Sequence, residues 1–130
     1  MAMMANKGES LAPGVEPDLL SRETYEEATA FHSDLPCTIT FDTLPLSRGG
    51  WVKSRDFYPA GQYLKGVEVQ GWGGAGGSLV LWIEELNIGF SYVTNAFGAA
   101  EGILGDFRGK NLLDLVVKAR KQELGLLPLD

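Results

Sequence analysis

The second half of the chain alternates between apolar and polar positions in a way that predicts three consecutive antiparallel strands. Val67–Gln70 alternates strictly, which is typical of a strand with one buried face. Leu79–Ile83 is apolar throughout, and the polar residues Glu84–Asn87 after it predict a short turn. The third strand alternates from Ile88 onward and is expected to end near Asn95.

Two helical segments are expected before residue 33. Met1–Asn6 consists of good helix formers and runs into a Lys-Gly pair typical of a helix C-terminus. It is interpreted either as the last turns of a helix or as a frayed tail. Arg22–Phe31 is preceded by Ser21, a suitable N-cap, and has acidic residues in its first turns. We expect it to form a surface helix.

The last helix is predicted from about Arg108 to Leu124, where it covers the sheet. Its apolar side chains are expected on one face and its charged side chains on the opposite face. The expected apolar face consists of Leu112, Leu113, Val116 and Val117, and the expected charged face consists of Lys110, Asp114 and Lys118.

The fold class that these elements predict is α+β: an antiparallel sheet of about three to five strands, covered by a C-terminal helix and preceded by a short helical segment. Within a single partial domain over 1–130, we expect a helical segment at 1–32 and antiparallel strands at 66–95. Residues 33–65 are broken up by proline and predict loops with short strands, and 106–124 contains the last helix.

Composition excludes several function classes. The formal charge of −6 leaves no electrostatic footprint for a nucleic-acid backbone, so nucleic acid is not an expected partner. Cys37 and His32 are the only cysteine and histidine, which leaves no Cys/His ligand set for a metal. His32 is expected at the C-terminal end of the second helix in a structural or solvated role. No apolar run approaches the roughly 20 residues of a membrane span, no cofactor is indicated, and the compartment is undetermined.

The stretch Gly71–Ser78 holds five of the seventeen glycines and lies between two apolar runs. Gly71, Gly73 and Gly76 satisfy the dinucleotide-binding spacing Gly-x-Gly-x-x-Gly. That fingerprint requires a helix after the third glycine and an acidic residue about 20 positions further on. The following residues predict a strand, and no acid stands at that distance, so nucleotide binding is an unfavoured alternative.

The same stretch, together with the apolar run, the acidic turn, Gly89–Asn95 and the terminal helix, resembles the C-terminal region of the serine β-lactamase-related family. That family includes class C β-lactamases, penicillin-binding-protein-like carboxypeptidases and related esterases. The resemblance extends upstream through Leu19–Ala28, and Met1–Asn6 is similar to the end of the preceding family helix. It implies that Trp72, Gly73 and Gly74 take the place of the family's third motif, with the Ala75 amide as the donor to the oxyanion.

Two family motifs are missing from the chain. No serine is followed three positions later by lysine, so the Ser-x-x-Lys nucleophile motif is absent. No tyrosine is followed two positions later by asparagine or serine, so the proton-transfer motif is absent as well. Trp72 also replaces the cationic or hydrogen-bonding first residue of the third motif, and an indole offers only stacking and one donor. It is alternatively interpreted as a packing residue that the neighbouring glycines accommodate.

The sequence therefore predicts the C-terminal portion of a β-lactamase-related serine hydrolase that is inactive alone. With only the last helix covering the sheet, Leu79, Leu81 and Ile83 or their opposite-face neighbours are expected to stay partly exposed. Such a patch favours a homo-oligomer or association with a full-length homologue. The alternative from another class is a non-catalytic binding or regulatory module that docks through the bare sheet face.

Overall fold

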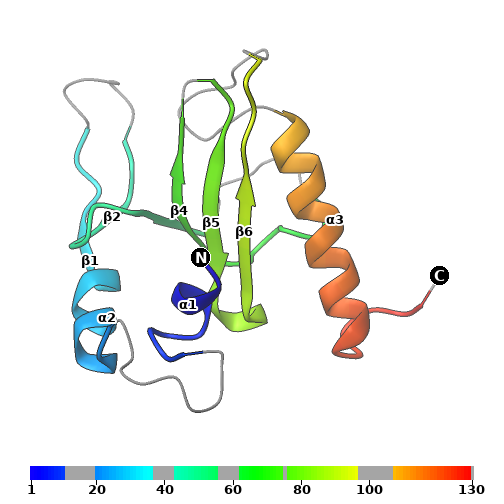
Figure 1. Cartoon of the computed structure of the whole chain (residues 1–130), viewed down its shortest axis with the longest axis horizontal. Helices are drawn as coiled ribbons and strands as arrows, with labels where there is room; N and C mark the ends of the chain where they lie inside the picture. The colour runs from blue at the N-terminus through cyan, green and yellow to red at the C-terminus, as the bar shows by residue number, and fades with distance from the viewer. Residues whose placement is uncertain (11–19, 37–42, 56–61, 75, 97–106, 130) are drawn as a thin grey trace.

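A computed structural model of the chain describes residues 1–10, 20–36, 43–55, 62–74, 76–96 and 107–129 (Figure 1). Its centre is one antiparallel sheet of six strands, in which every strand pairs with its neighbours in chain order. The strands are β1 (Phe31–Ser33), β2 (Leu46–Ser47), β3 (Val52–Ser54), β4 (Val69–Gly73), β5 (Leu79–Ile83) and β6 (Ile88–Tyr92). The α+β class predicted from the sequence is confirmed, with short strands β1 to β3 extending the sheet.

Three α-helices pack beside the sheet in the described part of the chain. They are α1 (Ala2–Ala5), α2 (Arg22–Thr29) and α3 (Phe107–Glu123), and one 3-10 turn, η1 (Glu84–Leu86), joins β5 to β6. The turn η1 ends at Asn87 in the left-handed conformation, as suits an asparagine in a tight connection. The helix α1 ends through Lys7 and Gly8, which both have positive φ.

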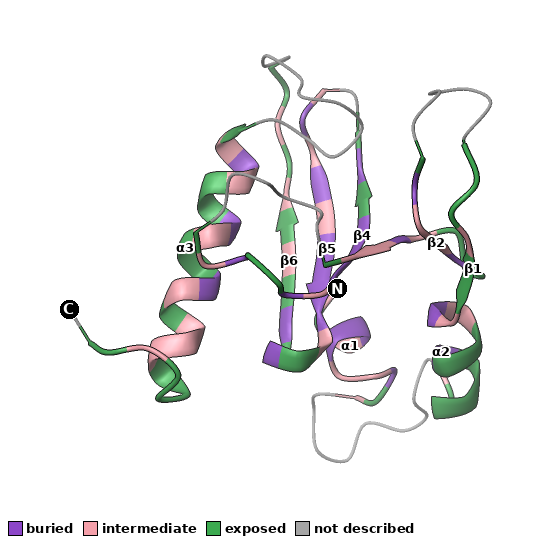
Figure 2. Cartoon of the chain, turned by 180° about the vertical axis from the view of Figure 1, so that it is seen from behind, coloured by how far each residue is buried: buried purple, intermediate pink, exposed green. Residues whose placement is uncertain are grey.

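One face of the sheet packs against α3. Leu79, Leu81 and Ile83 of β5 point to this face and are at most 1 % exposed, against Leu113 and Val117 of α3. A chain segment that includes Leu64 and Val67 crosses the same face and completes the core, as Figure 2 shows from behind. Exposure was expected for Leu79, Leu81 and Ile83 or for their opposite-face neighbours. The first alternative is wrong, because α3 and this segment cover these three residues together. Of the opposite-face neighbours, Val80 is half-buried and Trp82 is fully buried.

Among the residues that the structure describes, the opposite face is covered only at one end. Trp82, which points away from α3, is fully buried in a second cluster with Met4, Ala5 and Tyr25, and Trp51 contacts it edge-on with ring centroids 5.4 Å apart. The glycine at 89, paired with Trp82, lets α1 approach, since a Cβ there would lie 2.4 Å from the backbone nitrogen of Ala2. The helices α1 and α2 thus cover the end of this face at Trp82.

Three expected details differ in the structure. The second helix ends at Thr29 instead of Phe31, because Ala30 turns extended and the next residues pair with β2. His32 therefore lies exposed in β1, not at a helix terminus. The strand that was predicted at Val67–Gln70 begins instead at Val69 and continues to Gly73.

The helix α3 also presents a different side to the sheet. Its buried residues are Gly109, Leu113 and Val117, whereas Leu112 is 47 % exposed and Val116 is 39 % exposed. The glycine permits close packing, since a Cβ at 109 would lie 2.7 Å from Cδ1 of Leu79. The helix face that was expected to be charged also has a packing role. One carboxylate oxygen of Asp114 accepts hydrogen bonds from the backbone N–H groups of residues 63 and 64, at 2.8 and 2.9 Å.

Candidate functional site

The glycine-rich stretch forms the end of β4 and a tight connection to β5. The N–H of Gly74 donates to the carbonyl of Ser78 at 2.8 Å, and the N–H of Gly77 donates to the carbonyl of Gly74 at 2.8 Å. The hydroxyl of Ser78 accepts the backbone N–H of Thr94 at 3.2 Å, which ties the turn to the end of β6. The amides of Gly74 and Gly77 are thus used within the turn.

The glycines of this stretch differ in what surrounds them. Gly71 is buried at φ 143°, and a Cβ there would lie 2.2 Å from the carbonyl oxygen of Val80 and 2.8 Å from Cα of Leu81. Its lack of a side chain therefore serves the contact between β4 and β5. Gly74 is exposed, and a Cβ there would meet only the Ser78 carbonyl oxygen at 3.9 Å. Of these two positions, Gly74 leaves space for an external group.

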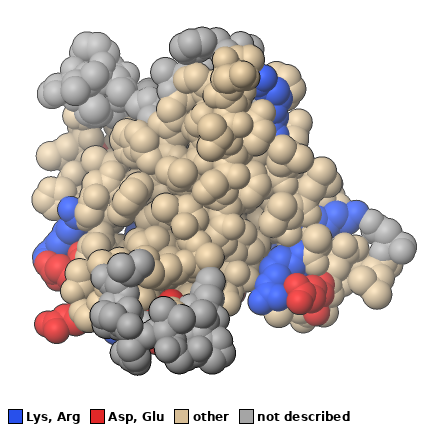
Figure 3. Space-filling view, in the orientation of Figure 1, with Lys and Arg blue, Asp and Glu red and all other residues tan. Residues whose placement is uncertain are grey.

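Trp72 lies on the sheet face that does not pack against α3. It pairs with Val80, which pairs with Ser91, so the three side chains form a row across β4, β5 and β6. Trp72 is 36 % exposed, Val80 is half-buried and Ser91 is exposed. We call this row the open sheet face; α1 covers the adjacent row at Trp82 but not this one. Figure 3 shows charged side chains at the margins of the view and none across its middle.

The sequence-predicted site residues stand close together at this end of the sheet. Trp72 and Gly73 are the last residues of β4, and Gly74 begins the turn. Gly73 is buried, while Trp72 and Gly74 are exposed. Ala75, the proposed oxyanion donor, lies outside the described residues. The arrangement provides an indole at Trp72 and a position without a side chain at Gly74, next to the open sheet face.

A dinucleotide site at these glycines is contradicted by the structure. The fingerprint needs a helix N-terminus aimed at the pyrophosphate after the third glycine. The residues that follow form strand β5 from Leu79 to Ile83. The nucleotide-binding alternative is therefore withdrawn.

A polar cluster that the sequence did not predict joins both N-terminal helices to η1. The buried Tyr25 hydroxyl donates to Oε2 of Glu84 at 2.9 Å, and Nζ of Lys7 lies 2.7 Å from Oε1 of the same carboxylate. Burial raises the pKa of Tyr25 to about 12, and the bond to the carboxylate adds to this. Burial opposes ionisation of Glu84, but the Lys7 ammonium and the Tyr25 hydroxyl outweigh it and lower its pKa.

Further charges continue this cluster along β3. Nζ of Lys53 donates to the carbonyl of Thr29 at 3.2 Å and lies 3.5 Å from the Glu68 carboxylate. Arg55 donates to the carbonyl of Gly66 at 2.9 Å and lies 3.5 Å from Glu85. Each cation faces a carboxylate and a backbone carbonyl. Lys53 connects β3 to the end of α2, and Arg55 connects the residue after β3 to Gly66 and to η1. None of these side chains is placed as a nucleophile.

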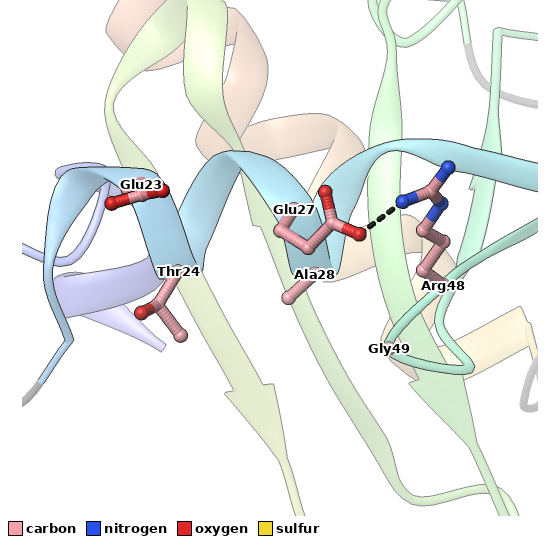
Figure 4. Close-up of a pocket in the computed structure, with 6 residues that line it drawn as sticks. All are labelled: Glu23, Thr24, Glu27, Ala28, Arg48 and Gly49. Atoms are coloured by element: carbon pink, nitrogen blue, oxygen red, sulfur yellow. Dashed lines mark hydrogen bonds and ion pairs between the residues drawn. The ribbon is translucent and has the colours of Figure 1, made fainter.

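A depression beside α2 is shown in Figure 4, lined by Glu23, Thr24, Glu27, Ala28, Arg48 and Gly49. Arg48 pairs with Glu27, and its backbone N–H donates to the Ala30 carbonyl at 2.9 Å. The N–H of Gly49 donates to the Ala28 carbonyl at 2.8 Å. The β2–β3 turn therefore caps the C-terminal end of α2, which is a structural role.

Two classes of site are not found in the part of the chain that the structure describes. Within it, no three His, Cys, Asp or Glu side chains are grouped as a metal would require. None of its helices combines the length and apolar character needed to cross a membrane. Cys37 lies outside the described residues.

Comparisons with known proteins found no match to this chain. No protein-family model matches the chain. Searches of the curated proteins and of the solved structures also returned no match.

Proposed function

We propose that this chain is the sheet-and-helix portion of a β-lactamase-related serine hydrolase, in which the end of β4 forms one wall of an acyl-binding site. The observation that carries the proposal is Trp72 beside the open turn at Gly74, at the edge of an uncovered sheet face. The resemblance assigns the family's third motif to this position. A carbonyl can approach the turn closely, because Gly74 presents no side chain to it.

The distribution of helices supports the proposal. The resemblance implies a sheet with the N-terminal and C-terminal helices on one face and an all-helical region on the other. In this chain α3 covers the face of Leu79 and Leu81, while α1 and α2 pack at Trp82 on the opposite face. The open sheet face beside them is where the family's helical region would bring a nucleophile.

The chain alone is expected to be catalytically inactive, because it contains no Ser-x-x-Lys motif. Ser78, the serine of the glycine-rich turn, accepts the Thr94 amide and has a structural role. We expect no turnover of p-nitrophenyl esters or of a chromogenic cephalosporin above a heat-denatured control. Turnover together with a fluorophosphonate-labelled serine, located by mass spectrometry, would refute this part of the proposal.

A second candidate function, a binding module, is favoured by the exposure of the open sheet face. Val80 and Ser91 continue the row from Trp72 across β5 and β6, and neither carries a charge. A full-length class C β-lactamase is the appropriate probe, immobilised for binding by surface plasmon resonance. Val80→Glu should abolish this binding, and Leu126→Glu, on the exposed C-terminal segment, should retain it. This result would favour a binding module over a role as one wall of an acyl-binding site.

A further inference from the structure

The helix α3 carries apolar side chains on two sides. One side, made of Gly109, Leu113 and Val117, is buried against the sheet. The other side is exposed: Leu112 is 47 %, Leu115 59 % and Val116 39 % accessible, and Ala119 is exposed next to them. A helix that buries one apolar side and exposes a second apolar side typically packs against a further surface.

The exposed apolar residues form a single stripe. Leu112, Leu115, Val116 and Ala119 follow the i, i+3, i+4, i+7 spacing of one helix face, and we call them the outer stripe. Figure 2 shows exposed residues along the side of α3 that is turned away from the sheet. This surface is separate from the open sheet face, which lies on β4 to β6.

Opposite charges stand at the two ends of the outer stripe. Arg108 lies four residues before Leu112, and Glu123 lies four residues after Ala119, so both fall on the same helix face. Each charge is at the helix end that the macrodipole disfavours for it, a cation in the first turn and an anion in the last. Within the chain, Arg108 donates to the Ala96 carbonyl at 3.0 Å and Glu123 pairs with Arg120 at 2.8 Å.

We propose that the outer stripe is the interface of a homodimer, in which two copies of α3 pack antiparallel about a two-fold axis between Leu115 and Val116. This register sets Leu115 against Val116 of the second copy and Leu112 against Ala119. Large side chains then face smaller ones on both sides of the axis. The same register sets Arg108 against Glu123 at both ends, where the opposing helix dipoles favour the pair.

A second copy is the occupant that the stripe itself specifies. An isologous interface requires that residue i contacts j and that j contacts i, and every pair above meets this condition in one register. The contact is small, because Arg108 and Glu123 are only about 22 Å apart along the helix, and a standard interface buries about 800 Å² per partner. The expected dissociation constant is therefore on the order of 10 µM.

The test is sedimentation velocity of the full chain from about 1 µM to about 1 mM, together with four variants. We expect a reversible monomer–dimer equilibrium whose dissociation constant rises about 100-fold or more in Leu115→Glu, since each new carboxylate would be buried against Val116 of the second copy. Arg108→Glu should weaken the dimer about tenfold, and Arg108→Glu combined with Glu123→Arg should restore it. Val93→Glu is the matched control, because Val93 is 82 % exposed and follows β6 rather than lying on α3.

The proposal is overturned if the chain remains monomeric up to about 1 mM. It is also overturned if Leu115→Glu dimerises as the wild type does, or if Val93→Glu abolishes association, which would place the contact at the sheet. Circular dichroism checks that each variant is folded. If Leu115→Glu does not fold, the charge-swap pair decides: recovery in the double variant supports the register, and failure to recover refutes it.

Discussion

Replacement of Gly71 by alanine tests whether the glycines of β4 have separate structural and ligand-facing roles. At φ 143° an alanine is strained, and such a backbone costs on the order of 1–3 kcal/mol for a residue with a Cβ. The new Cβ would also lie 2.2 Å from the Val80 carbonyl oxygen, a backbone atom that moves only if β5 moves. Overpacking of this kind costs a further 1–3 kcal/mol, roughly.

We therefore expect Gly71→Ala to lower the free energy of unfolding by about 2–6 kcal/mol, a large part of a typical total of about 5–15 kcal/mol. Gly74→Ala is the matched control, since the nearest atom to its Cβ is 3.9 Å away. Its effect should stay within about 0.5 kcal/mol of the wild type.

Urea unfolding followed by far-UV circular dichroism measures both variants. With a slope of about 1–3 kcal/mol per molar urea, Gly71→Ala should lower the midpoint by about 1–3 M. Unfolding free energies for Gly71→Ala and Gly74→Ala that agree with each other, whether near the wild type or equally reduced, would refute the assignment of close strand packing to Gly71 alone.

Three further predictions test the packing around the site. Gly89→Ala should push α1 off the sheet and lower the free energy of unfolding by about 1–3 kcal/mol. The fluorescence emission of Trp82 should then shift to longer wavelength, and an unchanged spectrum would contradict the assigned α1 contact. The raised pKa of Tyr25 means that the folded state holds the phenolic proton more tightly than the unfolded state does. The stability that this gives is present below pH 10 and is lost as pH rises from about 10 to about 12. The loss is at most about 2 kcal/mol after solvent screening. Tyr25→Phe should remove that alkaline loss in urea titrations, and the same loss in the variant would exclude Tyr25 as its source. Asp114→Ala should cost about 1–3 kcal/mol, because two backbone N–H groups lose their acceptor, and Asp114→Asn should cost less; equal losses would contradict this cap.

The elements with strong periodicity were predicted from the sequence. The apolar run at Leu79–Ile83 and the 17-residue helix α3 both occur where their patterns indicate. Strand β1 was missed because Phe31–Ser33 continues the helical pattern of α2, and its extended form depends on pairing with the two-residue strand β2. A strand of two residues has too few positions to show any alternation.

The buried side of α3 could not be chosen from the helix alone. Both of its sides are apolar, and the choice of Leu113 over Leu112 follows from Gly109, which lets the helix approach Leu79 and Tyr92. Sequence spacing gives a helix face but not the partner surface that it meets. The outer stripe is consequently a finding of the structure.

The candidate site stays a prediction. The structure places Trp72 and Gly73 at the end of β4 and Gly74 at the start of the turn that follows. The cluster of Tyr25 with Glu84 was not predicted, because the two residues are 59 positions apart and neither belongs to a local motif. Such contacts arise from tertiary packing of α2 against η1.

The most direct test of the central claim is a ¹H–¹⁵N titration of the chain with benzylpenicillin, which carries a β-lactam carbonyl and a carboxylate. The account predicts shifts confined to the indole of Trp72 and the backbone amides of Gly73, Gly74 and Ala75. Gly74→Val, which fills the open side of the turn, should abolish them while the remaining spectrum stays that of the folded chain. Shifts that occur elsewhere, that persist in Gly74→Val, or that are absent up to about 10 mM would contradict an acyl-binding wall at the end of β4.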